Sequence, residues 1–274
     1  MTQGNATDPR AVFSRLVGGS VVAARLRVAR LLIWFGVKPN TLTVLGLVVT
    51  LAGAVLLVYG AGDRPGSSLR GGHSWLGVAA ALVLILASAF DILDGAVARL
   101  KGQITERGAC LDSCVDRLSD GAIFLGIMLY YVRHPEVDGW RLFAAAAVVA
   151  LVNAELISYV KARAENFIPS CPVGYWQRGE RIAGVLIGLC CGHIATVLLM
   201  LAVLSGLTVL RRITFAYRQI KRQELGRPLL EPYRLEGIMR LALWRYRRRT
   251  VPYDLVTATN IAVILFVDAE SWFR

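Results

Sequence analysis

The sequence lacks the cysteine spacing that zinc sites use. None of its five cysteines forms a C-x-x-C pair: Cys110 and Cys114 bracket Asp112, and Cys190 and Cys191 lie in an apolar run. Zinc centres of that type are therefore excluded, and we expect buried free thiols facing a reducing cytoplasm. The first residues also lack an apolar core with a small-residue cleavage site. No secretory signal is recognisable, and targeting is expected from the first membrane span.

Charged residues are scarce: they make up 18% of the chain, against 55% hydrophobic residues, and the mean hydropathy is +0.54. This balance excludes an ordinary soluble domain. Apolar runs predict an all-α integral membrane protein with six transmembrane helices and an N-terminal amphipathic interfacial helix. The runs cover about residues 41–60, 75–90, 121–132, 142–160, 182–192 and 194–210. Only Gly188 to His193 is available to turn the chain within 182–210, so one long or broken helix is the alternative there.

Acidic residues are outnumbered, with 19 Asp and Glu against 31 Lys and Arg, and the net charge is +12. With six spans and the N-terminus inside, nearly all basic residues fall on cytoplasmic segments, as the positive-inside rule requires. The exceptions are Arg64, Arg70, Arg133 and Arg141. The charge therefore indicates membrane orientation and attraction to an anionic leaflet, not nucleic-acid binding. We expect a multi-pass cell-membrane protein with both termini and the active site on the cytoplasmic side.

The chain divides into three regions by composition. Residues 1–38 form a cytoplasmic N-terminus, in which 11–36 interleaves apolar and arginine positions as an amphipathic juxtamembrane helix does. Residues 39–212 hold the predicted six-helix domain. Residues 213–274 form a basic cytoplasmic tail that is expected to dock on the membrane surface, because its longest apolar run, Ile261 to Val267, is too short to span.

Acidic residues are nevertheless concentrated in one of the most apolar regions. Asp91 and Asp94 share a face of one predicted helix, and Asp112, Asp116 and Asp120 form an i, i+4 stripe on the next. A charged side chain at mid-bilayer depth costs roughly 2.5–3.5 kcal/mol, so bound cations are expected to offset the cluster. Carboxylate oxygens select Mg²⁺, Mn²⁺ or Ca²⁺ over zinc, and four carboxylates can hold two ions about 4 Å apart. A packed polar network is the alternative, but such networks tend to balance charge, whereas these stripes carry acids alone.

The spacing D-x2-D-G-x2-A-R-x8-G-x3-D-x3-D, from Asp91 to Asp116, resembles the signature of the CDP-alcohol phosphotransferase family. The resemblance extends over about Pro39 to Arg212, and it implies six membrane helices, a homodimer and two Mg²⁺ ions, with Mn²⁺ as a substitute. It also implies transfer of a phosphate-bearing group from a CDP-linked donor to an alcohol, with release of CMP. The implied metal ligands are Asp91, Asp94, Asp112 and Asp116, of which Asp116 is also the general base. The implied CDP-donor residues are Asn40, Gly95, Ala98, Arg99, Thr105 and Gly108.

Two further segments carry cations at predicted cytoplasmic helix ends. Residues 158–165 have the sequence S-Y-V-K-A-R-A-E, and residues 178–181 have R-G-E-R. Such a cluster suits an acceptor that already bears a phosphate, because Arg and Lys form charge-assisted hydrogen bonds with its oxygens. The segments resemble the branch of the family that joins inositol phosphate to CDP-diacylglycerol in bacteria, and its archaeal ether-lipid counterparts. The implied acceptor-phosphate residues are Ser158, Lys161, Arg163, Arg178, Arg181 and Arg212.

Alternatives remain open for the acceptor and for the role of the protein. Glycerol 3-phosphate would use a similar cationic pocket, as in phosphatidylglycerophosphate synthases. A metal-binding transporter or scaffold without enzymatic activity is expected to spread its acids over several spans, whereas these cluster on the second and third. Asp120, one turn beyond Asp116, is expected to support the site or the packing rather than take part directly in catalysis.

Overall fold

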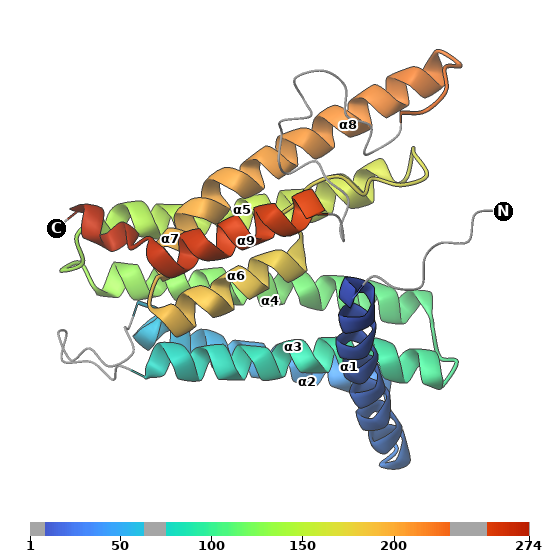
Figure 1. Ribbon diagram of the computed structural model, residues 1–274, viewed down its shortest axis with the longest axis horizontal. Helices are drawn as coiled ribbons and strands as arrows, with labels where there is room; N and C mark the ends of the chain where they lie inside the picture. Colours follow the sequence, from blue (N-terminus) through green and yellow to red (C-terminus); the bar gives the residue numbers. More distant parts are fainter. Residues whose placement is uncertain (1–8, 63–74, 231–250, 274) are drawn as a thin grey trace. The chain divides into compact units, whose positions relative to one another are not determined.

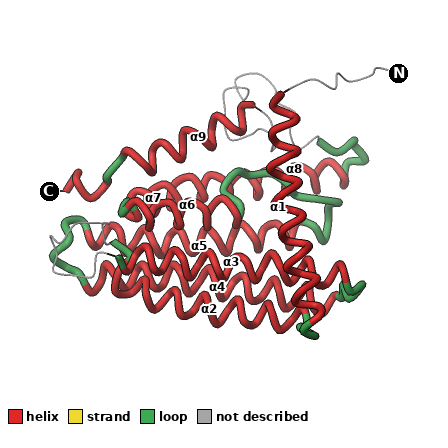
Figure 2. Tube along the Cα trace, turned by 60° about the horizontal axis from the view of Figure 1, so that its bottom comes forward, coloured by secondary structure: helices red, strands yellow, loops and turns green. Residues whose placement is uncertain are grey.

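The computed structural model describes residues 9–62, 75–230 and 251–273, and the regular elements in these ranges are helical (Figures 1 and 2). The predicted all-α fold is confirmed. The helices are α1 (Pro9–Trp34), α2 (Pro39–Gly60), α3 (Leu76–Leu100), α4 (Glu106–Arg133), α5 (Trp140–Ala164), α6 (Arg178–Cys191), α7 (Ile194–Met200), the π-helical segment η1 (Leu201–Ser205), α8 (Gly206–Glu224), α9 (Val251–Phe266) and the short 3-10 helix η4 (Ala269–Phe273). The chain forms two compact units, Met1–Val49 with Ile85–Leu118, and Thr50–Leu84 with Ser119–Arg274.

The first unit contains α1, the start of α2, the second half of α3 and the first half of α4. Its core is small: Ala29 of α1 and Leu42 of α2 pack with Ala96 and Val97 of α3. Lys101, which follows α3 directly, donates to the carbonyl of Val37 at 2.7 Å and ties the end of α3 to the start of α2. Helix α1 covers the segment predicted as an interfacial helix, and its placement on the membrane surface stays a prediction.

The second unit contains α5, which contacts α7, η1 and α8. The buried face of α5 is lined by alanines at successive turns, among them Ala144, Ala147, Ala150 and Ala154. Small residues let helix backbones approach closely, and this close packing is a main source of helix association inside a membrane. Larger side chains such as Phe124 of α4 and Leu198 of α7 complete the core.

The chain turns between α6 and α7 at Gly192, whose φ of 72° lies in the left-handed region that favours glycine. The amide of Gly192 donates to the carbonyls of Gly188 and Leu189 and closes the end of α6. Helix α7 then continues through η1 into α8, so that Ile194–Glu224 is one helical stretch. Residues 182–210 therefore form two helices, as the six-helix prediction requires, rather than one long helix.

Four helical stretches in the described part of the chain are long and apolar enough to cross a membrane: Pro39–Gly60, Leu76–Leu100, Trp140–Ala164 and Ile194–Glu224. They indicate a multi-pass membrane protein. Helix α4 falls outside this group because its first half carries the charged residues of the signature, and α6 because it has only 14 residues. The count of six spans stays a prediction.

Helix α9 lies along α6 and runs in the same direction (Figure 1). Near the start of α9 the Tyr253 hydroxyl donates to Glu180 Oε1 at 2.7 Å, and near its end the Ile264 carbonyl lies 2.8 Å from Nδ1 of His193. The short apolar run of the predicted tail thus belongs to a longer helix that packs on α6 within the second unit. The division at residues 38 and 212 stays a prediction, and 231–250 of the tail lie outside the described residues.

The cysteines are free thiols, but only Cys171 is buried, whereas Cys110, Cys114 and Cys190 are exposed. The prediction of buried thiols is wrong for these three. Cys110 and Cys114 are four residues apart and share one face of α4, and apolar neighbours in the sequence do not specify which face of a helix is packed.

Candidate active site

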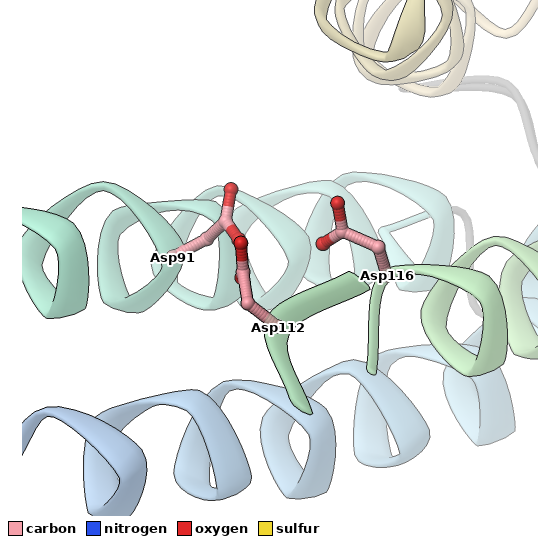
Figure 3. A group of neighbouring side chains, drawn as sticks. All are labelled: Asp91, Asp112 and Asp116. Carbon is pink, nitrogen blue, oxygen red and sulfur yellow. The ribbon is translucent and has the colours of Figure 1, made fainter. Parts of the chain in front are cut away.

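Three carboxylates of the first unit point into one space (Figure 3). Asp91 comes from α3, and Asp112 and Asp116 come from successive turns of α4. One ligand oxygen from each lies within 4.8 Å of the others, and all three residues are half-buried. The i, i+4 spacing on α4 places Asp112 and Asp116 on the same face, and the packing of α3 in the same unit adds Asp91. The predicted convergence of the two stripes is thus seen for these three aspartates.

Asp94, the fourth predicted metal ligand, is buried beside this group. Its Oδ2 accepts a hydrogen bond from Thr43 Oγ1 at 2.6 Å, and its carboxylate interacts electrostatically with those of Asp112 and Asp91. Thr43 is a functional candidate that sequence reasoning missed, because it lies on α2, 51 residues before Asp94. A hydroxyl donor to a ligating carboxylate typically orients that carboxylate and tunes the metal it binds.

The three-aspartate cluster fits a hard divalent cation. It offers only oxygen ligands, which Mg²⁺ and Mn²⁺ prefer. Oxygens around one Mg²⁺ at about 2.1 Å lie at most about 4.2 Å apart, so a small rotation of these side chains brings them to bonding distance. Arg117 Nη2 lies 3.9 Å from Asp116 Oδ2, at the outer limit of an ion pair. Three carboxylates that converge in this way form a donor set that could hold one such cation.

The predicted nucleotide-binding residues flank the carboxylates in the same unit. The amide of Gly108 donates to Thr105 Oγ1 at 3.1 Å, and a Cβ at Gly108 would lie 3.2 Å from that oxygen and 3.5 Å from Asn40 Oδ1. A Cβ at Gly95 would lie 3.4 Å from Nη2 of Arg99, because the guanidinium folds back over the glycine. The structure thus brings Asn40, Thr105 and Gly108 together, and it brings Arg99 onto Gly95. Half-buried Ala98 precedes Arg99 directly on α3.

The predicted acceptor residues belong to the second unit and fall into two groups. Lys161 and Arg163 are exposed at the end of α5, where Arg163 lies over the ring of Phe167, and Arg178 is partly exposed at the start of α6. The side chains of the other group form hydrogen bonds within the protein; its members are Ser158, Arg181 and Arg212. Ser158 donates to the carbonyl of Ala154 at 3.3 Å.

Arg181 and Arg212 are almost fully buried. Arg181 donates to Asp120 Oδ2 at 2.7 Å and to the carbonyl of Trp176 at 3.1 Å. Arg212 donates to the carbonyls of Val173, at 2.8 Å, and of Ile157. Both guanidiniums therefore stabilise the segment between α5 and α6, and their predicted role toward an acceptor is not tested by these contacts.

Asp120 has the supporting position that the sequence favoured. It is fully buried, it binds Arg181, and its Oδ1 lies 3.6 Å from Nε of Arg178. Charge compensation by two arginines makes a buried carboxylate stable, and here it also fixes the start of α6.

Comparison with known proteins places these features in one family. The profile of the family described as CDP-alcohol phosphatidyltransferase matches residues 37–224. The chain is 37% identical over 161 residues to phosphatidylinositol phosphate synthase of Mycobacterium tuberculosis, which covers 59% of this chain and 66% of the relative. It therefore spans just under two thirds of that relative's length. It is 34% identical over 181 residues to archaetidylinositol phosphate synthase of Methanothermobacter thermautotrophicus, covering 63% of this chain and 83% of the relative.

Solved structures agree with the sequence matches. Crystal structures of the Mycobacterium tuberculosis phosphatidylinositol phosphate synthase, one with CDP-DAG bound and one in complex with manganese and citrate, each superpose with a TM-score of 0.60 at 31% identity. They cover 70% of this chain, and 93% and 88% of those chains respectively. The profile match includes the α3–α4 carboxylates and ends at the last residue of α8. The chain belongs to the CDP-alcohol phosphatidyltransferase family.

Proposed function

We propose that the protein is a membrane phosphatidyltransferase of phospholipid synthesis that transfers the phosphatidyl group of CDP-diacylglycerol to inositol phosphate and releases CMP. The observation that carries this proposal is the convergence of Asp91, Asp112 and Asp116 within a complete family signature. Carboxylates that converge in this way suit the binding of cations and, through them, of a diphosphate.

In the proposed reaction a hydroxyl oxygen of the acceptor attacks the β-phosphorus of CDP-diacylglycerol. The new P–O bond forms as the bond to the CMP oxygen breaks, and CMP leaves with that bonding pair. Asp116 accepts the proton of the attacking hydroxyl, while Asp91, Asp94 and Asp112 complete the metal-binding set. Two bound Mg²⁺ ions, or Mn²⁺ in their place, would supply charge neutralisation of the diphosphate and of the leaving CMP. A relative crystallised with manganese supports this choice of cation.

The donor end of the site is assigned to the residues around Gly95 and Gly108. Two helix positions without a side chain leave the backbone accessible where the nucleotide must approach closely. Asn40 and Thr105 offer polar atoms beside Gly108, and Arg99 offers a guanidinium beside Gly95. Ala98 completes this group, and the relative with CDP-DAG bound supports the donor.

The acceptor is assigned as a phosphorylated polyol. The exposed Lys161 and Arg163 and the partly exposed Arg178 offer cationic groups to its phosphate. Ser158, Arg181 and Arg212 belong to the same proposed site, in which the two buried arginines hold its framework through Asp120 and backbone carbonyls. Two relatives, a phosphatidylinositol phosphate synthase and an archaetidylinositol phosphate synthase, support inositol phosphate over glycerol 3-phosphate.

We further propose that the active site and the N-terminus face the cytoplasm and that the protein acts as a homodimer. The distribution of Lys and Arg supports the orientation. The family resemblance supports the dimer.

An assay of CMP release with four different acceptors tests this function. Purified protein in detergent is given CDP-diacylglycerol and Mg²⁺ with inositol 1-phosphate, free inositol, glycerol 3-phosphate or serine, and CMP release is measured. We expect release with inositol 1-phosphate and little with the others. Release with glycerol 3-phosphate alone would keep the chemistry and overturn the acceptor. No release with any acceptor, while the protein binds Mg²⁺, would contradict the enzymatic function and favour a metal-binding transporter or scaffold.

A further inference from the structure

Helix α9 lies beyond the region that matches the family profile, yet it contacts the segment that leads into α6. The Tyr253 hydroxyl donates to Glu180 Oε1 at 2.7 Å, and the Tyr175 hydroxyl donates to Thr257 Oγ1 at 2.9 Å. The rings of Tyr175 and Tyr253 lie 5.2 Å apart between their centroids. Two hydrogen bonds and a ring contact thus join the first turns of α9 to residues 175–180.

Glu180 lies among residues of the proposed acceptor site. It lies in the first turn of α6, between Arg178 and Arg181 of the proposed acceptor site. Its carboxylate interacts electrostatically with the guanidinium of Arg212, a residue of the same proposed site. A carboxylate there can compete with a phosphate for that guanidinium, because both are anions that accept charge-assisted hydrogen bonds. The Tyr253 hydroxyl supplies Glu180 with a neutral donor and so fixes one carboxylate oxygen at a defined point.

Tyr175 and Trp176 reinforce the same segment. Tyr175 is buried and is held by Thr257, and the Trp176 carbonyl accepts a hydrogen bond from Arg181. The Arg181 guanidinium is therefore bonded to a stretch of chain that also contacts α9.

We propose that Tyr253 is a positioning residue for the acceptor-phosphate site, acting through Glu180 and the 175–181 segment. This proposal rests on the proposed function, in which Arg178 and Arg181 belong to the site of the acceptor phosphate. It assigns to α9, which lies outside the family match, a role in acceptor affinity and none in donor binding or in the chemical step.

The test is a comparison of Tyr253→Phe with Tyr217→Phe, a matched control whose hydroxyl is exposed on α8. Tyr253→Phe should raise the acceptor KM about fivefold, because a hydrogen bond to a charged group is lost, while kcat and the KM of CDP-diacylglycerol stay within about twofold. Tyr217→Phe should change none of these values. An unchanged acceptor KM, or an equal rise in both KM values, would overturn the proposal.

A double-mutant cycle gives an independent readout of the path through Glu180. If Tyr253 acts through Glu180, the effects of Tyr253→Phe and Glu180→Gln on the acceptor KM should be strongly non-additive. Additive effects would overturn that path. Wild-type protein is assayed first with each acceptor, so that failure of the proposed function appears as absent CMP release before any variant is compared.

A second inference comes from the other end of α9. Glu270 of η4 is buried and accepts a hydrogen bond from the Tyr131 hydroxyl, near the end of α4, at 3.1 Å. Phe273 packs edge-on against Phe143, near the start of α5, with ring centroids 5.7 Å apart. Thr196 of α7 accepts from the amide of Ala269 at 3.0 Å. Residues 269–273 therefore lie near the N-terminal end of α5.

Lys161 and Arg163 lie at the opposite end of α5. Phe143 and Lys161 are 18 positions apart, which corresponds to about 27 Å of helix, close to the thickness of a hydrocarbon core. We infer that the C-terminal residues lie on the membrane face opposite Lys161, so that α9 is embedded in the membrane beside α6. This differs from the sequence expectation of a cytoplasmic C-terminus.

Cysteine accessibility tests this inference with a matched Ser→Cys pair in a variant without native cysteines. Ser271 and Ser170 are both exposed, and they lie beyond opposite ends of α5. In intact cells a membrane-impermeant maleimide should label Ser271→Cys and not Ser170→Cys, and both should react after permeabilisation. Labelling of both or of neither in intact cells, or of Ser170→Cys alone, would overturn the inference.

Discussion

Arg181 and Asp120 form a buried ion pair in which Arg181 Nη2 lies 2.7 Å from Asp120 Oδ2. Both side chains are almost completely inaccessible to solvent. The pair joins α6 to α4, and Arg178 adds a second, longer contact of 3.6 Å to the same carboxylate. One aspartate thus helps to fix the start of α6, which carries Arg178 and Arg181 of the proposed acceptor site.

Replacing Asp120 should destabilise the protein strongly. Asp120→Asn leaves the Arg181 guanidinium buried without its counter-charge, and removal of one partner of a buried pair costs about 3–5 kcal/mol. We expect a fall in Tm of the detergent-solubilised protein well beyond that of Asp138→Asn, an exposed control in the turn between α4 and α5. Equal Tm values for the two variants would contradict this role of the ion pair.

Thr43 should tune the metal site through Asp94. Thr43→Val removes the 2.6 Å hydrogen bond to Asp94 Oδ2 without a large change in volume. We expect the Mg²⁺ concentration for half-maximal CMP release to rise about tenfold, as is typical when a partner of a ligating group is lost. Thr43→Ser retains the hydroxyl and should behave nearly as the wild type. A rise of the same size in Thr43→Ser would show that the hydrogen bond is not the cause.

Asp116 should be required for turnover rather than for donor binding. Asp116→Asn removes the group that accepts the proton, and CMP release should fall at least about a hundredfold. Binding of CDP-diacylglycerol, measured by equilibrium dialysis or calorimetry, should be largely retained. Normal turnover in this variant would exclude Asp116 as the general base.

Lys161 should act on the acceptor alone. Lys161→Ala removes an exposed ammonium group from the end of α5 and should raise the KM of inositol phosphate far more than that of CDP-diacylglycerol. Lys221→Ala, at an exposed position near the end of α8, is the control and should leave both values unchanged. A similar rise in both KM values for Lys161→Ala would argue against a dedicated acceptor-phosphate site there.

Cys171 should react slowly with thiol reagents. Burial raises the pKa of the Cys171 thiol, and the nearby Arg212 only partly offsets this effect. A raised pKa means less thiolate at a given pH, so alkylation should be slow near neutral pH and should increase only at higher pH. In single-cysteine variants, maleimide should label Cys110, which is exposed, much faster than Cys171. Equal rates at pH 7.5 would contradict this expectation.

Much of the fold could be predicted because the sequence patterns are local. The i, i+4 spacing of Asp112 and Asp116 fixes their common face, and the glycines and histidine around Gly192 mark the turn after α6. The contacts that could not be predicted join residues far apart in the sequence. The bond from Thr43 to Asp94 is one such contact, and neither residue carries a local signal that names its partner.

Burial explains the remaining differences. Arg181 and Arg212 were predicted from charge at helix ends, where cations are usually exposed, but backbone carbonyls and Asp120 surround them here. The apolar run Ile261 to Val267 is by itself too short to span a membrane. Helix α9 begins earlier, at Val251, and its polar residues Tyr253 and Thr257 form hydrogen bonds with Glu180 and Tyr175.

The most direct test of the central claim is metal-dependent release of CMP from CDP-diacylglycerol by the purified wild-type protein, compared with its Asp91→Asn and Asp112→Asn variants. The proposed function predicts release that requires both inositol 1-phosphate and Mg²⁺, that stops on addition of a chelator, and that is lost in both variants. Release that persists in the two variants, or that continues after the chelator is added, would contradict the assignment of the catalytic centre to the aspartates of α3 and α4.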